Sequence, residues 1–145
     1  MLKFEMEKQE MQKNDMQKIQ TENKETGKTR FETGMKNLKK IDGSSGEAVL
    51  QALKETAPDL GRYIVEFAFG DIYERSGLSL QERELITLAS LLTAGGCEAQ
   101  LEVHIQGALH TGIPREKIIE AFLQCIPYTG FPKVLNAVFT AKKLF

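Results

Sequence analysis

Residues 79–104, SLQERELITLASLLTAGGCEAQLEVH, decide the fold that we predict for this chain. Ser79 and Glu82 have the spacing of a capping box, in which each side chain bonds a backbone N–H of the first turn, so a helix is expected to begin here. Apolar residues then recur at helical spacing, which predicts a mostly buried helix. A Gly-Gly pair predicts its end, because glycine adopts a left-handed C-cap without a side-chain clash. A second helix is expected to follow at once, starting near Cys97.

This second helix carries Cys97 at its beginning and His104 two turns further on. Unpaired N–H groups and the positive end of the helix dipole favour a thiolate at such a position. The two residues are separated by roughly 10 Å along a helix axis, at about 1.5 Å per residue, so Gln100, a water or a group from another helix would have to bridge them. Free cysteines are also among the most buried residues, so Cys97 is either part of a site with His104 or a small core residue.

Composition excludes several classes of protein. A length of 145 residues suits one domain, and a net charge of −1 gives no electrostatic reason to bind nucleic acid. No apolar run approaches the roughly 20 residues that cross a bilayer, and the N-terminus lacks the apolar core of a secretion signal. We therefore expect a cytoplasmic protein with no membrane or nucleic-acid partner. The two cysteines make neither a disulfide framework nor a four-ligand metal site.

Outside the central stretch, the chain divides into a polar tail and a helical domain. Residues 1–29 are polar and charged without a helical stripe, so we expect a flexible N-terminal tail, followed by a domain over residues 30–145. A turn is expected at residues 42–46. No strand-like alternation appears, and the fold class is predicted to be all-α. Besides the central pair, helices are expected over residues 30–41, 47–55, 58–74, 114–126 and 132–145.

Two features near the C-terminus bear on a site. Cys125 is expected in the last turn of its helix, where filling the core is a better interpretation than serving as a redox partner. Residues 127–132, PYTGFP, are expected to form a rigid loop. Such a loop would place Tyr128 and Phe131 where they line a pocket, although ordinary connectors look similar.

The second half of the chain resembles a known family. The string ELITLASLLTAGGCEAQLEVHIQGALHTGIPREKIIEAF, residues 84–122, is similar to the carboxymuconolactone decarboxylase family, which includes the alkylhydroperoxidase-D-like proteins. The upstream FGDIYERSGLSLQERE resembles the approach helix and entry turn of that family. The resemblance runs from about Arg30 to the end of the chain. It implies a compact helical subunit in a homo-oligomeric ring, a trimer or hexamer, with residues 58–74 and the C-terminal helix as contact surfaces.

Two branches of this family differ in their site residues. The lactone decarboxylases carry a glutamate four residues before the motif histidine, a position that Gln100 occupies here. The alkylhydroperoxidase-D-like branch has a C-x-x-C pair ending at that same position, and a glutamate one helix earlier. This chain keeps the first cysteine, Cys97, and the histidine, His104. Glu84 matches the glutamate of the earlier helix, and Glu98 is a second candidate carboxylate.

The preferred functional hypothesis is a thiol-dependent redox enzyme, either a peroxidase or a disulfide reductase. Cys97 would attack as a thiolate while His104 and Glu84 relay protons through Gln100 or water. Oxidised Cys97 would then be resolved by Cys125 or by an external thiol. This hypothesis requires Cys97 and His104 to face each other across a small hollow that water can reach.

Two alternatives stay open. One is cofactor-free decarboxylation or isomerisation of a small carboxylic acid or lactone, with His104 as proton donor and Arg83 or Arg62 holding a carboxylate; Arg83 could equally be a solvated helix residue. The other is a non-catalytic oligomeric scaffold that binds a small ligand. No cofactor or metal is expected, since Cys97, His104 and Glu84 would supply at most three ligands without a dedicated motif.

Overall fold

The computed structural model describes residues 30–145, which are helical and contain no β-strand, as predicted. The tail predicted for residues 1–29 lies outside the described residues. Residues 30–41 form a first helix. The labelled elements are α2 (Gly43–Leu53), α3 (Pro58–Tyr63), the π-helix η1 (Ile64–Ile72), α4 (Leu80–Ala94), α5 (Glu98–His110), α6 (Arg115–Thr129) and α7 (Phe131–Lys142). In the part of the chain described, no helix combines the length and apolarity needed to cross a membrane.

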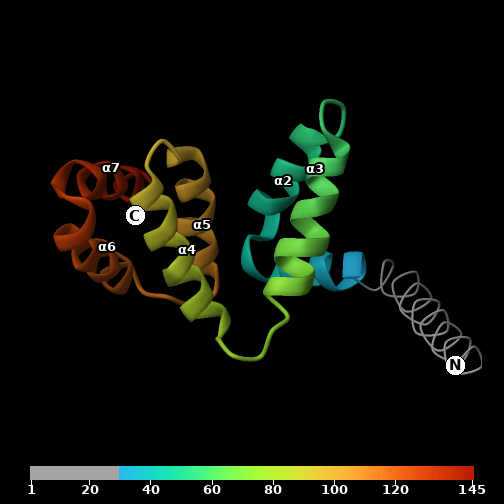
Figure 1. Cartoon of the computed structure of the whole chain (residues 1–145), viewed down its shortest axis with the longest axis horizontal. Coiled ribbons are helices and arrows are strands. Elements are labelled where there is room, and N and C mark those ends of the chain that lie inside the picture. Colours follow the sequence, from blue (N-terminus) through green and yellow to red (C-terminus); the bar gives the residue numbers. More distant parts are fainter. Residues whose placement is uncertain (1–29) are drawn as a thin grey trace, which may run out of the picture.

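The central helix pair forms as its sequence predicts. The Ser79 backbone N–H donates to the Glu82 carboxylate over 2.7 Å, and the Glu82 backbone N–H donates to the Ser79 hydroxyl over 3.2 Å, which completes the capping box. Gly95 and Gly96 have φ values of 74° and 68° and turn the chain between α4 and α5. The two helices lie side by side (Figure 1). Cys97 is the N-cap of α5.

The helices form two groups, each with its own core (Figure 1). Residues 30–41 pack on η1 through Leu38, Ile41, Val65 and Phe69. A Cβ atom at Gly34 would lie 2.0 Å from the backbone oxygen of Val65, so only glycine permits this close approach. The four C-terminal helices share a larger apolar core, with the buried side chains Leu88, Leu92, Leu101, Ile105, Ala108, Ile113, Ile118, Phe122, Val134, Ala137 and Ala141.

The predicted turn at residues 42–46 is wrong beyond its first residue, because α2 already begins at Gly43. A Cβ atom at Gly46 would lie 2.8 Å from Leu38 and 2.9 Å from Asp42, so this glycine lets α2 pack tightly against the preceding helix. That packing overrides the weak helix propensity of the Gly-Ser-Ser-Gly sequence.

The helix predicted over residues 58–74 is continuous but changes its hydrogen-bond pattern. It is an α-helix in α3 and becomes a π-helix in η1, where the Tyr73 backbone N–H donates to Ala68 five residues earlier over 3.0 Å. The wider π turn alters the direction of each following side chain, and such turns are frequent at functional sites. Tyr73 is the C-cap of η1 and directly follows its last residue.

The rigid loop predicted at residues 127–132 is also wrong. Helix α6 continues through Pro127 to Thr129, and Gly130, with φ 81°, makes the turn into α7 by itself. Tyr128 and Phe131 are 81% and 67% exposed, so they lie on the surface instead of lining a pocket. Pro114 precedes α6 as its N-cap, one residue outside the helix.

Candidate active site

A cavity of about 490 Å³ lies between the two helical groups. Its walls come from both groups, because α2, the helix before it and η1 face α4 and α5 across it. Most of the lining is apolar, and a few polar side chains gather at one place. The lining residues are Leu38, Asp42, Gly46, Val49, Leu50, Ile64, Ala68, Phe69, Tyr73, Thr87, Ala99, Gln100, Val103 and His104.

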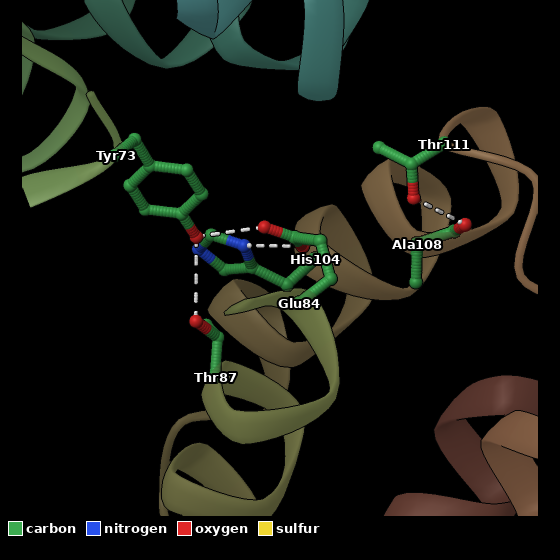
Figure 2. A network of polar contacts seen from close by, with 6 residues as sticks. All are labelled: Tyr73, Glu84, Thr87, His104, Ala108 and Thr111. Carbon is green, nitrogen blue, oxygen red and sulfur yellow. Dashed lines mark hydrogen bonds and ion pairs between the residues drawn. The ribbon is translucent and has the colours of Figure 1, made fainter. Parts of the chain in front are cut away.

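Behind this lining, a buried carboxylate connects three helical elements. Glu84, early in α4, has no exposed surface. The Tyr73 hydroxyl donates to its Oε1 over 2.7 Å, and His104 Nδ1 lies 3.2 Å from its Oε2 (Figure 2). The Tyr73 hydroxyl is also 3.3 Å from Thr87 Oγ1. The pairing of α4 with α5 therefore places the predicted residues Glu84 and His104 in direct contact.

The surroundings of His104 favour its protonated form. Burial of the ring lowers the pKa, but the hydrogen bond to Glu84 and the negative charges of Glu84 and Asp42 raise it, and the net pKa lies above the usual 6.5. With Nδ1 bound to Glu84, Nε2 has no hydrogen-bond partner within residues 30–145, and the His104 side chain lines the cavity. His104 therefore lies at the wall of the cavity in surroundings that favour its protonated, acidic form.

Asp42 is one of the site residues that sequence reasoning missed. It is 7% exposed, its Oδ1 has no hydrogen-bond partner, and it lines the cavity. Burial raises its pKa to about 6, a shift that His104 opposes and Glu84 reinforces. Its carboxylate oxygen, one from Glu84 and a ring nitrogen of His104 lie within 4.8 Å of one another, a spacing that could also suit a metal ion.

Two further residues shape this cluster. A Cβ atom at Gly107 in α5 would lie 2.5 Å from Asp42 Oδ1 and 3.3 Å from Glu84 Oε2, so glycine leaves room for both carboxylates. Burial, followed by the charge of Glu84, raises the pKa of Tyr73, which therefore stays a neutral hydrogen-bond donor. A glycine inside an apolar helix was the sequence signal for this close packing, whereas Tyr73 looked like one more apolar residue.

Cys97 lies elsewhere. It lines a separate cavity of about 20 Å³, together with Glu98, Leu101 and Lys133, and its Sγ donates to the Gly95 carbonyl over 3.5 Å. The predicted arrangement of Cys97 facing His104 across one hollow is therefore not found. The backbone of Cys97 is not helical, with φ −119° and ψ 30°, so its side chain does not continue the helix face of His104. Gln100, one turn before His104, does line the main cavity.

The remaining candidates also lie outside the main cavity. Cys125 is half-buried in α6, its Sγ donates to Ala121, and burial raises its pKa. Both cysteines are free thiols. Arg83 is buried, in contrast to a solvated helix residue, and donates to the Arg75 carbonyl while lying 5.8 Å from the Tyr73 ring.

Arg62, the other candidate for holding a carboxylate, lies on the surface of α3. Its side chain pairs with Asp59 over 3.4 Å. Neither Arg62 nor Arg83 therefore contributes a positive charge to the main cavity.

A helical domain in which a buried glutamate pairs with a partly buried histidine on the adjacent helix fits the family that the sequence resembles. The chain belongs to the carboxymuconolactone decarboxylase family, whose model matches residues 58–143. It is 31% identical over 96 residues to 4-carboxymuconolactone decarboxylase of Acinetobacter baylyi, covering 66% of this chain and 71% of that protein. It is 32% identical over 126 residues to nitrosuccinic acid decarboxylase npaB of Metarhizium robertsii, covering 83% of this chain and 85% of that protein.

These comparisons support the redox and the decarboxylase hypotheses to different degrees. Both of these relatives are named as decarboxylases, and neither name refers to a thiol or a peroxide. A third relative, an uncharacterised 15.0 kDa protein of Paracoccus denitrificans, is 26% identical over 97 residues and covers 66% of this chain and 72% of its own length. The decarboxylase alternative is therefore better supported than the redox hypothesis preferred from the sequence.

Proposed function

We propose that this chain decarboxylates a small carboxylic acid or lactone, with His104 as the proton donor. The observation that carries the proposal is the His104 ring held by buried Glu84 at the wall of a largely apolar cavity. The names of the two decarboxylase relatives support the same reaction class.

The reaction needs an electron-withdrawing group, such as a lactone carbonyl or a nitro group, next to the carbon that carries the carboxylate. The bond to the carboxylate breaks, carbon dioxide leaves, and the electron pair moves onto that group. The imidazolium of His104 then gives its Nε2 proton to the carbanion carbon, and water returns a proton to the ring. A positioned general acid of this kind contributes about 10²- to 10⁴-fold to the rate.

The other residues of the site support this step. Glu84 stabilises the imidazolium and fixes the ring, while the Tyr73 hydroxyl, which also contacts Thr87, donates to Glu84 and holds it in place. The apolar walls favour the loss of carbon dioxide, because they solvate a dispersed carbanion charge better than a localised carboxylate charge.

The direct test is carbon dioxide release from nitrosuccinate and from 4-carboxymuconolactone, the acids that the relatives' names indicate. Wild-type protein is expected to release carbon dioxide from at least one of them, and His104→Gln to be slower by about 10²-fold or more. His110→Gln is the matched control, because His110 is exposed on the same helix. Equal rates for His104→Gln and His110→Gln would refute the proposal.

We also infer that the subunit forms a homo-oligomer through the two surfaces expected from the sequence. Exposed apolar side chains gather on α3 with η1 and on α7, namely Leu60, Tyr63, Phe67, Ile72, Leu135 and Phe139. Exposed apolar patches of this kind are typical of subunit contacts. Light scattering on the eluting protein would give the subunit number, and a monomer at micromolar concentration would contradict the inference.

A further inference from the structure

The main cavity has an unbalanced set of charges. Among the described residues that line it there is no lysine or arginine, so His104 is its cationic side chain. Two carboxyl groups, Asp42 in the lining and Glu84 behind it, lie within 4.8 Å of a ring nitrogen of His104. When all three groups are charged, one positive charge therefore faces two negative charges in a mostly buried place.

A carboxylate ligand makes this imbalance worse. It would add a further negative charge inside apolar walls, and burying an unpaired charge is strongly unfavourable. Some group must therefore be neutralised, or the ligand must bind weakly. The least unfavourable way to neutralise the site is to protonate the group whose protonation costs the least free energy.

Among the ionisable groups of this cluster, Asp42 is the one that is most readily protonated. Tyr73, at the end of η1, already carries its proton, because its pKa is raised. His104, from α5, is already favoured in its protonated form. Glu84, from α4, is occupied by hydrogen bonds with both. Asp42 has an unpartnered buried oxygen, and its pKa of about 6 means that about a tenth of it is protonated at pH 7.

We propose that Asp42 takes up a proton when a carboxylate ligand enters the cavity, and that it then donates a hydrogen bond to that carboxylate. Binding is therefore coupled to proton uptake, and Asp42 determines the pH range in which acids bind. This inference rests on the proposed function in one respect, namely that the ligand of the cavity is a carboxylate.

The probe is hexanoate, which has no electron-withdrawing group and cannot be decarboxylated, with hexanamide as its uncharged match. Titration calorimetry of the full chain at pH 7, in buffers of different ionisation enthalpy, gives the number of protons bound per ligand. We expect nearly one proton for hexanoate and none for hexanamide. Above pH 6 the affinity for hexanoate should fall about tenfold per pH unit, while that for hexanamide stays constant.

The variant Asp42→Asn keeps the shape of the side chain and cannot bind the proton. It is expected to bind hexanoate without the proton uptake of the wild type, and with an affinity that changes little between pH 5.5 and pH 6.5, below the raised pKa of His104. Asp59→Asn, whose carboxylate is exposed on α3, is the control and should behave as wild type. Proton uptake that persists in Asp42→Asn would overturn the proposal, because another group would then be the acceptor.

A second measurement needs no variant. Infrared difference spectra of the wild-type protein, recorded with hexanoate carrying a ¹³C carboxylate, should show a new carboxylic acid band from the unlabelled protein. Absence of this band, or no binding of hexanoate at pH 5.5, would also overturn the proposal. Because no carbon dioxide is produced, these results are independent of the decarboxylation assay, and either proposal can fail alone.

Discussion

The substitution Glu84→Gln should lower the pKa of His104. In the wild type the surroundings raise this pKa above 6.5, and in the variant they should lower it below 6.5. The amide keeps the size of the side chain and an acceptor for the Tyr73 hydroxyl, but it removes a negative charge whose oxygen lies 3.2 Å from Nδ1. Burial is the largest single influence on this ring and lowers its pKa. Without Glu84, the charge of Asp42 alone opposes burial, so the pKa of His104 is expected to fall below 6.5.

The size of the change follows from the hydrogen bond that is lost. A hydrogen bond to a charged group is worth about 1.5–3 kcal/mol, and one pKa unit corresponds to 1.36 kcal/mol, so a fall of about 1–2 units is expected. At pH 7.5 the protonated fraction of His104, and with it the decarboxylation rate, should therefore decrease, by at most about 10- to 100-fold.

The assay is an NMR titration of the imidazole signals. The chain has two histidines, so the spectrum of His110→Gln identifies the signal of His104 directly. The stability of the protein gives a second readout. A pKa raised on folding adds stability that is present below pH 6.5 and is lost as the pH rises through the folded value. In Glu84→Gln this pH dependence should reverse its sign.

Two results would refute this reasoning. A pKa of His104 that stays above 6.5 in Glu84→Gln would mean that Glu84 is not what keeps the ring protonated. A lowered pKa without any change in the rate at pH 7.5 would mean that the proton on His104 is not used in catalysis.

Three further predictions concern stability, measured by urea denaturation. Tyr73→Phe should lower the free energy of unfolding by about 1–3 kcal/mol, because it leaves an oxygen of buried Glu84 without its donor. Gly34→Ala should lower it by about 2 kcal/mol or more, since its Cβ would lie 2.0 Å from the Val65 oxygen and overpacking outweighs the gain in helix propensity. Folding raises the pKa of the Asp42 carboxyl from 3.8 to about 6, so the wild type should lose stability as the pH rises from about 4 to 6. Asp42→Asn lacks this carboxyl, and its free energy of unfolding should gain about 3 kcal/mol relative to wild type between pH 4 and pH 7.

Each of these has a matched control on the surface. Tyr128→Phe removes the same hydroxyl as Tyr73→Phe, but from a tyrosine that is 81% exposed. Gly77→Ala adds the same methyl group as Gly34→Ala, at a position where no atom lies within 4 Å of the new Cβ. Asp59→Asn tests an exposed carboxylate. These controls should change stability by less than about 0.5 kcal/mol. A loss in a control as large as in its partner would contradict the specific contact proposed for that partner.

The fold was predictable where local signals decide it. The capping box at Ser79 and Glu82 and the Gly95–Gly96 turn act within a few residues, and both formed as expected. The secondary structure was predicted wrongly where tertiary packing, and not the local sequence, determines it. Residues 43–46 read as a turn but pack as a helix, and the π-helix in η1 left no recognisable mark in the sequence.

The candidate site was only partly predictable, for a related reason. Glu84 and His104 were found because family resemblance names positions on two adjacent helices, which then meet in space. Asp42 and Tyr73 belong to elements with no motif, and they reach the site through the packing of one helical group on the other. Cys97 was placed with His104 because both match positions of the family motif, whereas the N-cap position of Cys97 directs its side chain to another cavity.

One comparison tests the central claim most directly: the decarboxylation rates of Cys97→Ser and His104→Gln on the same acid. The account predicts that Cys97→Ser keeps the wild-type rate within about twofold, whereas His104→Gln loses about 10²-fold or more. Loss of activity in Cys97→Ser, with activity retained in His104→Gln, would contradict it and return the thiol to the centre of the chemistry.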